Sequence, residues 1–294
     1  IRRVAERCYL PMNHLIMDLI KRYGTNFKVS FSISGSALEQ FALHAPEVIE
    51  SFKELAKTGS VEFLAETYAH SLASLSDTDE FERQVQRHAA KMEELFGQKP
   101  VTLRNSSLIY SDQIGERVAA MGFESMLTDG AKHVLGWKSP NFVYTNEMNP
   151  RLKLLLKNSR LSDDLTLRFS DHSWHEWPLT ADKYARWLKD STQDSEIVNL
   201  FMNYETFGEN QLAETGIFEF MRSLLEYIFS TTDFEFLTPS EAVKKHQPVA
   251  PLHVPYPISW ADEEKDITGW LGNELQNEAF EELFKIQPKV EALN

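Results

Sequence analysis

Three stretches of the chain place polar side chains directly after short apolar runs, where a buried strand would end. They are residues 65–71, 104–110 and 203–209. Their carboxylates, imidazole, amides and hydroxyls are groups that bind a polar substrate or transfer protons. Hydrogen-bonding caps at strand ends would explain any one stretch. In a parallel barrel, however, the C-terminal ends of the strands meet at one rim, so the three together favour a single site.

The elements that must position these stretches alternate along the chain. Apolar runs predict strands at residues 27–33, 61–65, 101–105, 152–156, 165–169 and 197–202. Helical periodicity predicts helices over 79–96, after an N-cap at Ser111, over 211–230 and over 261–286. Thr238 and Glu241 form a capping box with Pro239 at the first helical position. This alternation predicts a parallel α/β sheet or barrel.

The C-terminal third has a different character from the rest. It is mostly helical, and its proline-rich stretch 247–257 predicts a surface strap because proline lacks a backbone donor. We therefore expect a barrel over residues 1–205, followed by a helical region over 206–294 packed on it. The sequence begins with Ile1 rather than Met, which is typical of a segment from the interior of a longer sequence. We therefore expect the first strand of the barrel to be missing.

Composition limits the classes of partner. The 294 residues include 44 acidic and 30 basic side chains, giving a net charge of −14. That charge repels phosphate backbones and anionic lipids, so neither nucleic acid nor a membrane surface is an expected partner. Cys8 is the single cysteine, which excludes an intrachain disulfide and a thiolate zinc site and fits a cytoplasmic location.

Residues 201–209, Phe-Met-Asn-Tyr-Glu-Thr-Phe-Gly-Glu, resemble the fourth sequence motif of glycoside hydrolase family 57 in its α-amylase branch. Residues 59–70 are similar to the second motif, 104–110 to the third, and 260–266 with 270–273 to the fifth. The family's first motif, a His-Gln-Pro near the N-terminus, is absent. His246-Gln-Pro248 has those letters in a different region, and we interpret it as a coincidence.

The resemblance implies an incomplete seven-stranded (β/α) barrel with a helical C-terminal region, acting on α-1,4-glucans with retention of configuration. Retention needs two carboxyl groups about 5–5.5 Å apart. The family's nucleophile is a Glu in the third motif, at the position of Ser107 here, and its acid/base is an Asp in the fourth motif, at the position of Asn203. A serine has no charge to stabilise the transition state, and an asparagine cannot deliver a proton.

We therefore expect an α-amylase-like protein that binds α-glucan or maltooligosaccharide with little or no hydrolysis. The alternative is an active retaining hydrolase or glucanotransferase that uses displaced carboxylates, for which Glu205, Glu209, Asp112 and Glu116 are the neighbours. Natural divergence and a deliberate double substitution would both give Ser107 and Asn203. A metal-dependent deacetylase on a related barrel would need paired aspartates and two histidines at fixed spacing, which the sequence lacks, so we expect no metal and no cofactor.

Each of the remaining candidate residues could have either a structural role or a role in binding the substrate. Glu62, Glu205 and His70 belong to the matched motifs as substrate-binding candidates, and His70 would equally serve as a cap. Trp137, Trp260 and Trp270 offer flat faces for glucose rings but are as readily core residues. Asp262 and Asp266 suit sugar hydroxyls or a solvated helix start. His172 and His175 lie close together without a recognised metal-ligand spacing.

Overall fold

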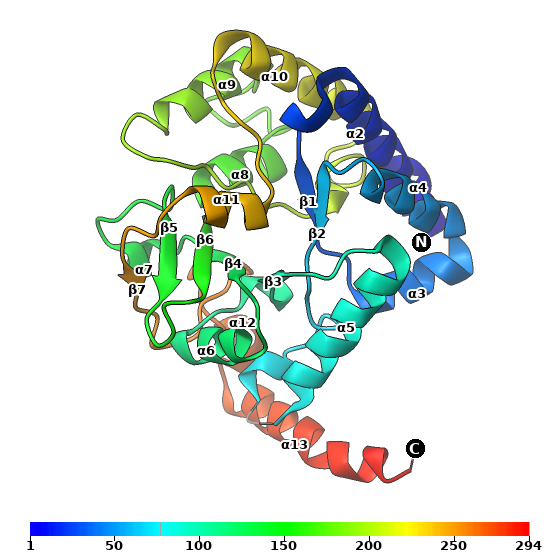
Figure 1. Cartoon of the computed structure of the whole chain (residues 1–294), viewed down its shortest axis with the longest axis vertical. Coiled ribbons are helices and arrows are strands. Elements are labelled where there is room, and N and C mark those ends of the chain that lie inside the picture. Colours follow the sequence, from blue (N-terminus) through cyan, green and yellow to red (C-terminus); the bar gives the residue numbers. More distant parts are fainter. Residues whose placement is uncertain (77, 294) are drawn as a thin grey trace.

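Short strands form the centre of the computed structural model, which describes residues 1–76 and 78–293. One sheet pairs β1 with β2, and the second has the order β3-β4-β6-β5-β7. A parallel bridge between Ala65 and Leu103 joins the end of β2 to β3, so the two sheets follow one curved path (Figure 1). The strands are β1 (Val29–Phe31), β2 (Val61–Phe63), β3 (Thr102–Arg104), β4 (Ser125–Asp129), β5 (Val143–Asn146), β6 (Lys153–Lys157) and β7 (Pro251–Leu252).

The curved sheet stays open on one side. All neighbouring strands run parallel except β5 and β6, which are antiparallel. Residues 197–202 lie beside the end of β6 in space but do not form a strand. The amide of Asn158 donates to the carbonyl of Asn199 at 2.9 Å. No strand pairing among the described residues links this segment to β1. The prediction of an incomplete (β/α) barrel with a helical C-terminal region is confirmed.

Helices surround the strands and continue beyond them. The N-cap at Ser111, whose Oγ accepts from the amide of Ile114 at 3.3 Å, and the capping box of Thr238 and Glu241 are both confirmed. The helices are α1 (Arg2–Val4), a π-helix (Ala5–Tyr9), α2 (Leu10–Tyr23), α3 (Gly35–His44), α4 (Pro46–Ala56), α5 (Glu80–Phe96), α6 (Asp112–Ala120), α7 (Lys132–Leu135), α8 (Ser159–Thr166), α9 (Ala181–Asp190), α10 (Ile217–Thr231), α11 (Pro239–Lys245), α12 (Thr268–Leu271) and α13 (Glu274–Glu291).

Two apolar clusters hold most of the core. The larger one packs α2, α4 and α10 against β1 and β2, with the rings of Phe31 and Phe52 in edge-to-face contact at 5.1 Å. The second packs α5 and α6 against the sheet around Leu103 and Met126. Burying such side chains contributes roughly 1.5–3 kcal/mol each. These clusters fix the strand ends from which the candidate site is built.

Four sequence-based predictions were wrong, and the strand over 197–202 described above is one of them. Residues 165–169 are not a strand, because Leu161 and Leu165 lie on one buried face of α8 behind the N-cap of Asn158. The predicted helix over 261–286 is replaced by a loop, α12 and α13, since Asn273 starts a new helix. The proline-rich stretch is not a surface strap alone: it supplies β7 and buries Leu252, with 1% of its surface exposed.

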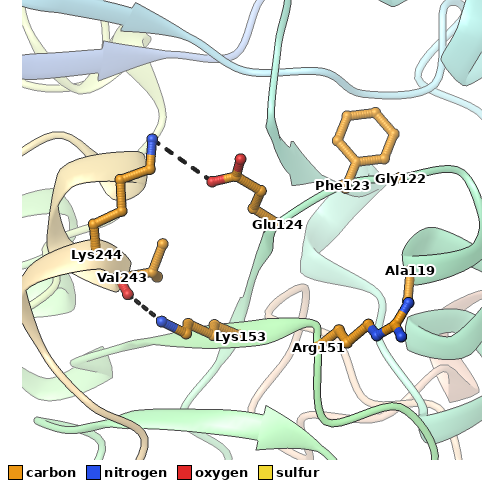
Figure 2. A pocket seen from close by; sticks show the side chains of 8 residues that line it. All are labelled: Ala119, Gly122, Phe123, Glu124, Arg151, Lys153, Val243 and Lys244. Atoms are coloured by element: carbon orange, nitrogen blue, oxygen red, sulfur yellow. Dashed lines mark hydrogen bonds and ion pairs between the residues drawn. The ribbon is translucent and has the colours of Figure 1, made fainter.

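Helix α11 is tied to the N-terminal ends of β4 and β6. A small cavity of about 350 Å³ separates them, and Figure 2 shows the side chains that line it. Lys153 Nζ donates to the carbonyl of Val243, and Lys244 pairs with Glu124 at 3.7 Å. The two lysines are therefore engaged in contacts that hold α11 in place.

Among the described residues, no helix combines the length and apolar character needed to cross a bilayer.

Candidate functional site

A cavity of about 1080 Å³ opens beside the ends of β1, β2 and β3 and is bounded on its other side by residues 195–207. Five of the residues singled out from the sequence line it together, although they are far apart in the chain. They are His70, Ser107, Asn203, Glu205 and Trp260. The polar ends of three different elements therefore meet in one concave surface.

Ser107 has an unusual backbone conformation. It lies in a one-turn helix after β3 with φ 48° and ψ 29°, in the left-handed region that costs a non-glycine residue about 1–2 kcal/mol. Two contacts hold it there: the carbonyl of Ser107 accepts from the amide of Trp260 at 3.1 Å and from Oγ of Ser259 at 2.9 Å. The 258–265 segment thus fixes the position that the family resemblance assigns to the nucleophile.

Glu66 is the most enclosed carboxylate on the cavity wall. It is 2% exposed, accepts from Oγ of Ser32 at 2.7 Å and pairs with Arg104 at 3.3 Å, while Nδ1 of His70 lies 3.7 Å away. Burial raises the pKa of Glu66, but His70, Arg104 and Ser32 together outweigh it and hold the pKa below its usual value. Glu66 is therefore ionised at neutral pH and has no proton to donate.

The ring of Trp260 contacts two cations. The guanidinium of Arg104 and the ammonium of Lys157 are each 5.0 Å from its ring centroid. Such cation–π contacts contribute about 0.5–2 kcal/mol each. Burial lowers the pKa of Arg104, and the neighbouring Glu66 carboxylate raises it. Because Arg104 contacts both Trp260 and Glu66, the ring, the cation and the carboxylate form one connected group. An aromatic surface beside hydrogen-bonding groups is suited to a sugar ring.

Asn203 and Glu205 come from a loop that leaves the open edge of the barrel. The side chain of Asn203 is exposed, and its carbonyl accepts from the amide of Thr206 at 3.1 Å. The hydroxyl of Tyr9 donates to Oε1 of Glu205. The amide of Asn203 therefore faces solvent, whereas the Glu205 carboxylate is fixed by the N-terminal helices.

Five further candidates do not line the cavity, and we leave them out of the site. Glu62 accepts from Thr102 at 2.8 Å and from the amide of Ser240 at 2.9 Å, so it joins β2 and β3 to α11. Trp137 is 93% exposed on the loop after α7, and Trp270 packs on the second apolar cluster. The other two make turns: Asp262 accepts from the amide of Lys265, and Asp266 accepts from Thr268 at the start of α12.

Tyr9, Ser32, Glu66 and Arg104 also line the cavity and were not singled out from the sequence. Glu66 and Arg104 lie in two of the polar strand-end stretches, so the signal that found His70 and Ser107 extends to them. Tyr9 and Ser32 lie in elements whose sequence carries no such signal. They become visible only when the chain is folded.

No three His, Cys, Asp or Glu side chains in the described part of the chain are grouped so as to hold a metal ion. His172 stacks on Trp177 with ring centroids 4.1 Å apart, and His175 lies 3.7 Å from Glu176. Neither histidine lines the cavity. Their proximity in sequence therefore reflects local packing.

The described carboxylates whose pKa is raised lie elsewhere in the fold. Burial is the main cause for Asp112, Asp129 and Asp164. A general acid at neutral pH needs such a raised pKa. None of the three lines the cavity, so these raised pKa values do not act on the candidate site.

Comparison with known proteins identifies the family of the chain. The sequence profile described as "Glycosyl hydrolase family 57" matches residues 1–255. A curated Methanocaldococcus jannaschii protein named "Putative alpha-amylase" is 44% identical over 284 residues, which is 96% of this chain and 60% of that protein. The chain thus spans 60% of the length of that relative.

Solved structures share the fold at low sequence identity. A 4-alpha-glucanotransferase from Thermococcus litoralis has a TM-score of 0.71 at 17% identity, covering 87% of this chain and 39% of that one. A GH57 branching enzyme from Thermococcus kodakaraensis has a TM-score of 0.72 at 13% identity, covering 93% of this chain and 71% of that one. At these identities the likeness concerns the fold alone.

Proposed function

Because the chain belongs to glycosyl hydrolase family 57, we propose that it binds α-1,4-glucan or maltooligosaccharide with little or no hydrolysis. The observation that carries the proposal is the pair Ser107 and Asn203. Both line the cavity, at the positions that the motifs assign to the nucleophile and to the acid/base. Neither side chain can perform the corresponding step.

The cavity is nevertheless suited to a neutral, hydroxyl-rich ligand. Trp260 offers an aromatic surface, and His70 and Asn203 are exposed hydrogen-bonding groups beside it. Sugar recognition needs this combination of an apolar face and polar edges. Losing both catalytic groups removes orders of magnitude in rate while leaving binding and orientation available.

A working hydrolase or transferase is the second candidate, favoured by the location of Glu205. This carboxylate lies two residues from Asn203 and lines the same cavity. If it replaced the missing acid/base, the reaction would still need a nucleophile. Of the other lining carboxylates, Glu66 follows the neighbouring strand β2, and it is engaged by Ser32, Arg104 and His70.

Two further properties belong to the same proposal. We propose that residues 206–294 form a mainly helical region packed on the barrel. Helix α11 of this region lines one side of the cavity with Pro239, Ala242 and Lys245. The single cysteine, Cys8, is buried against the carbonyl of Tyr204 and fits a cytoplasmic protein.

Calorimetry with maltooligosaccharides of increasing length, beside a long incubation assayed for reducing sugar, tests the proposal. Binding without release of reducing ends supports it. Release that is abolished by Glu205→Gln supports the second candidate instead. The absence of both binding and release overturns both.

A further inference from the structure

The π-helix Ala5–Tyr9 packs against the loop that carries Asn203 and Glu205. Cys8 Sγ donates to the carbonyl of Tyr204 at 3.2 Å, and the hydroxyl of the next residue, Tyr9, donates to Glu205. A π-turn changes the direction in which successive side chains leave a helix, and such turns are frequent at functional sites. Here it lets two consecutive residues engage two consecutive residues of the loop.

The backbones of helix and loop are in direct contact. Gly208 has φ +103°, and a Cβ at this position would lie 1.9 Å from the carbonyl oxygen of Arg7. Arg3 adds an ion pair with Glu209. The 203–209 loop therefore has little freedom to move relative to the π-helix.

The ring of Tyr9 is fixed by its aromatic neighbours. It meets Phe41 edge-on at 4.9 Å and stacks on Tyr204 at 5.9 Å. Burial, followed by the hydrogen bond to Glu205, raises the pKa of Tyr9 well above its ordinary value. The hydroxyl therefore remains a donor at neutral pH, and its direction is set by the ring packing.

Glu205 has one oxygen engaged and one available. Oε1 accepts from Tyr9, whereas Oε2 has no hydrogen-bond donor within the described part of the chain. Glu205 lines the cavity, so Oε2 can accept a hydrogen bond from a ligand. A carboxylate held by one oxygen offers the other in a fixed direction, which lowers the entropy cost of binding.

We propose that Tyr9 is a positioning residue, which holds Glu205 so that its free oxygen accepts a hydroxyl of the bound sugar. The inference rests on the proposed function, because it assigns a ligand contact to the same cavity. It adds a residue from the N-terminal helices to a site otherwise built from strand ends and loops.

Tyr9→Phe removes the hydroxyl and keeps the ring contacts. Tyr68→Phe is the matched control, because Tyr68 also donates to a carboxylate, Glu39, at 2.6 Å, and neither of these residues lines the cavity. Maltooligosaccharide affinity is measured by calorimetry for both variants, for Glu205→Ala and for the double variant Tyr9→Phe with Glu205→Ala. Melting temperatures are recorded for all of them.

We expect Tyr9→Phe to weaken binding about tenfold, the effect of one charge-assisted hydrogen bond, while Tyr68→Phe leaves affinity unchanged. In the Glu205→Ala background, Tyr9→Phe should have no further effect, since it acts only through Glu205. A purely structural role would lower the melting temperature and add its loss of affinity to that of Glu205→Ala. Additive losses therefore overturn the proposal.

A measurement without ligand separates this inference from the proposed function. In protein labelled with carboxyl-¹³C glutamate, the Glu205 resonance is assigned by its absence from Glu205→Ala. It should move in Tyr9→Phe and stay in place in Tyr68→Phe. An unmoved resonance overturns the positioning role. If the resonance moves but the wild type binds no maltooligosaccharide, the proposed function fails, and with it the sugar contact of Glu205.

Discussion

Ser107 and Trp260 are joined through their backbones, the amide of Trp260 donating to the carbonyl of Ser107 at 3.1 Å. A second bond from Ser259 and the paired backbones of Tyr110 and Ile258 extend this connection. The segment that presents the aromatic side chain therefore also fixes the left-handed turn at position 107. A change in either residue will be transmitted to the other.

Restoring both carboxylates is the most direct test of the missing chemistry. We expect no measurable turnover of maltodextrin by the wild type, and little by Ser107→Glu or Asn203→Asp alone, because a nucleophile and a proton donor are both required. The double variant should exceed either single one, as residues that act as a unit are not additive. Reducing-sugar assays over long incubations measure this. Robust wild-type hydrolysis that is lost in Glu205→Gln would contradict the expectation.

The backbone at position 107 predicts a stabilising substitution. Ser107→Gly should raise the free energy of unfolding by up to about 1 kcal/mol, because glycine adopts φ 48° without the Cβ penalty. Chemical denaturation measures the change. Ser106→Gly is the control: Ser106 is 1% exposed and its hydroxyl hydrogen-bonds to Thr67 at 2.7 Å, so this change should destabilise. Equal effects at the two positions would count against strain at Ser107.

The enclosed Glu66 predicts a pH-dependent contribution to stability. Its pKa is lower in the folded protein than the value of about 4.3 expected when unfolded. Its ionised form therefore stabilises the fold fully above about pH 5, and the contribution is lost as the pH falls through the folded pKa. Glu66→Gln should cost up to about 3 kcal/mol at pH 7, because it removes the charge that pairs with the mostly buried Arg104.

The difference in unfolding free energy between wild type and Glu66→Gln should shrink below pH 4. Denaturant titrations at several pH values measure it, with the exposed Glu47→Gln as control. A difference that is constant with pH would show that Glu66 does not stabilise the fold through its charge.

The contact between Gly208 and Arg7 predicts a local steric effect. Gly208→Ala should cost about 2 kcal/mol or more, because the new Cβ would lie 1.9 Å from the carbonyl oxygen of Arg7. Gly216→Ala is the matched control, since Gly216 also has positive φ, +82°, but has no atom within 4 Å of an added Cβ. Thermal unfolding of both variants separates the cost of the contact from that of the backbone angle.

Local chemistry explains what could be predicted from the sequence. The caps at Ser111 and Thr238 and the strands near 61 and 101 follow from side chains close in sequence. Residues 165–169 were misassigned because Leu-Thr-Leu-Arg-Phe alternates like a strand, whereas the packing of α8 depends on Leu161 upstream.

The residues of the candidate site also differ in whether the sequence alone could reveal them. His70 and Ser107 could be found because strand ends in a barrel converge, and Asn203 through its motif. Tyr9 could not be found from the sequence, because its role depends on a π-turn and on a contact with Glu205, 196 positions away. Glu62 was selected by its motif, yet its carboxylate joins β2 to α11, which only the folded chain reveals.

The cation–π contacts of Arg104 and Lys157 with Trp260 give the cavity its own optical signal. Of the six tryptophans in the sequence, Trp260 is the one among the lining residues. Indole emission responds to nearby charge and to the loss of water. A ligand that displaces solvent from this ring will therefore change its fluorescence, and replacing the other five tryptophans by phenylalanine would leave a chain that reports occupancy of the cavity without an added label.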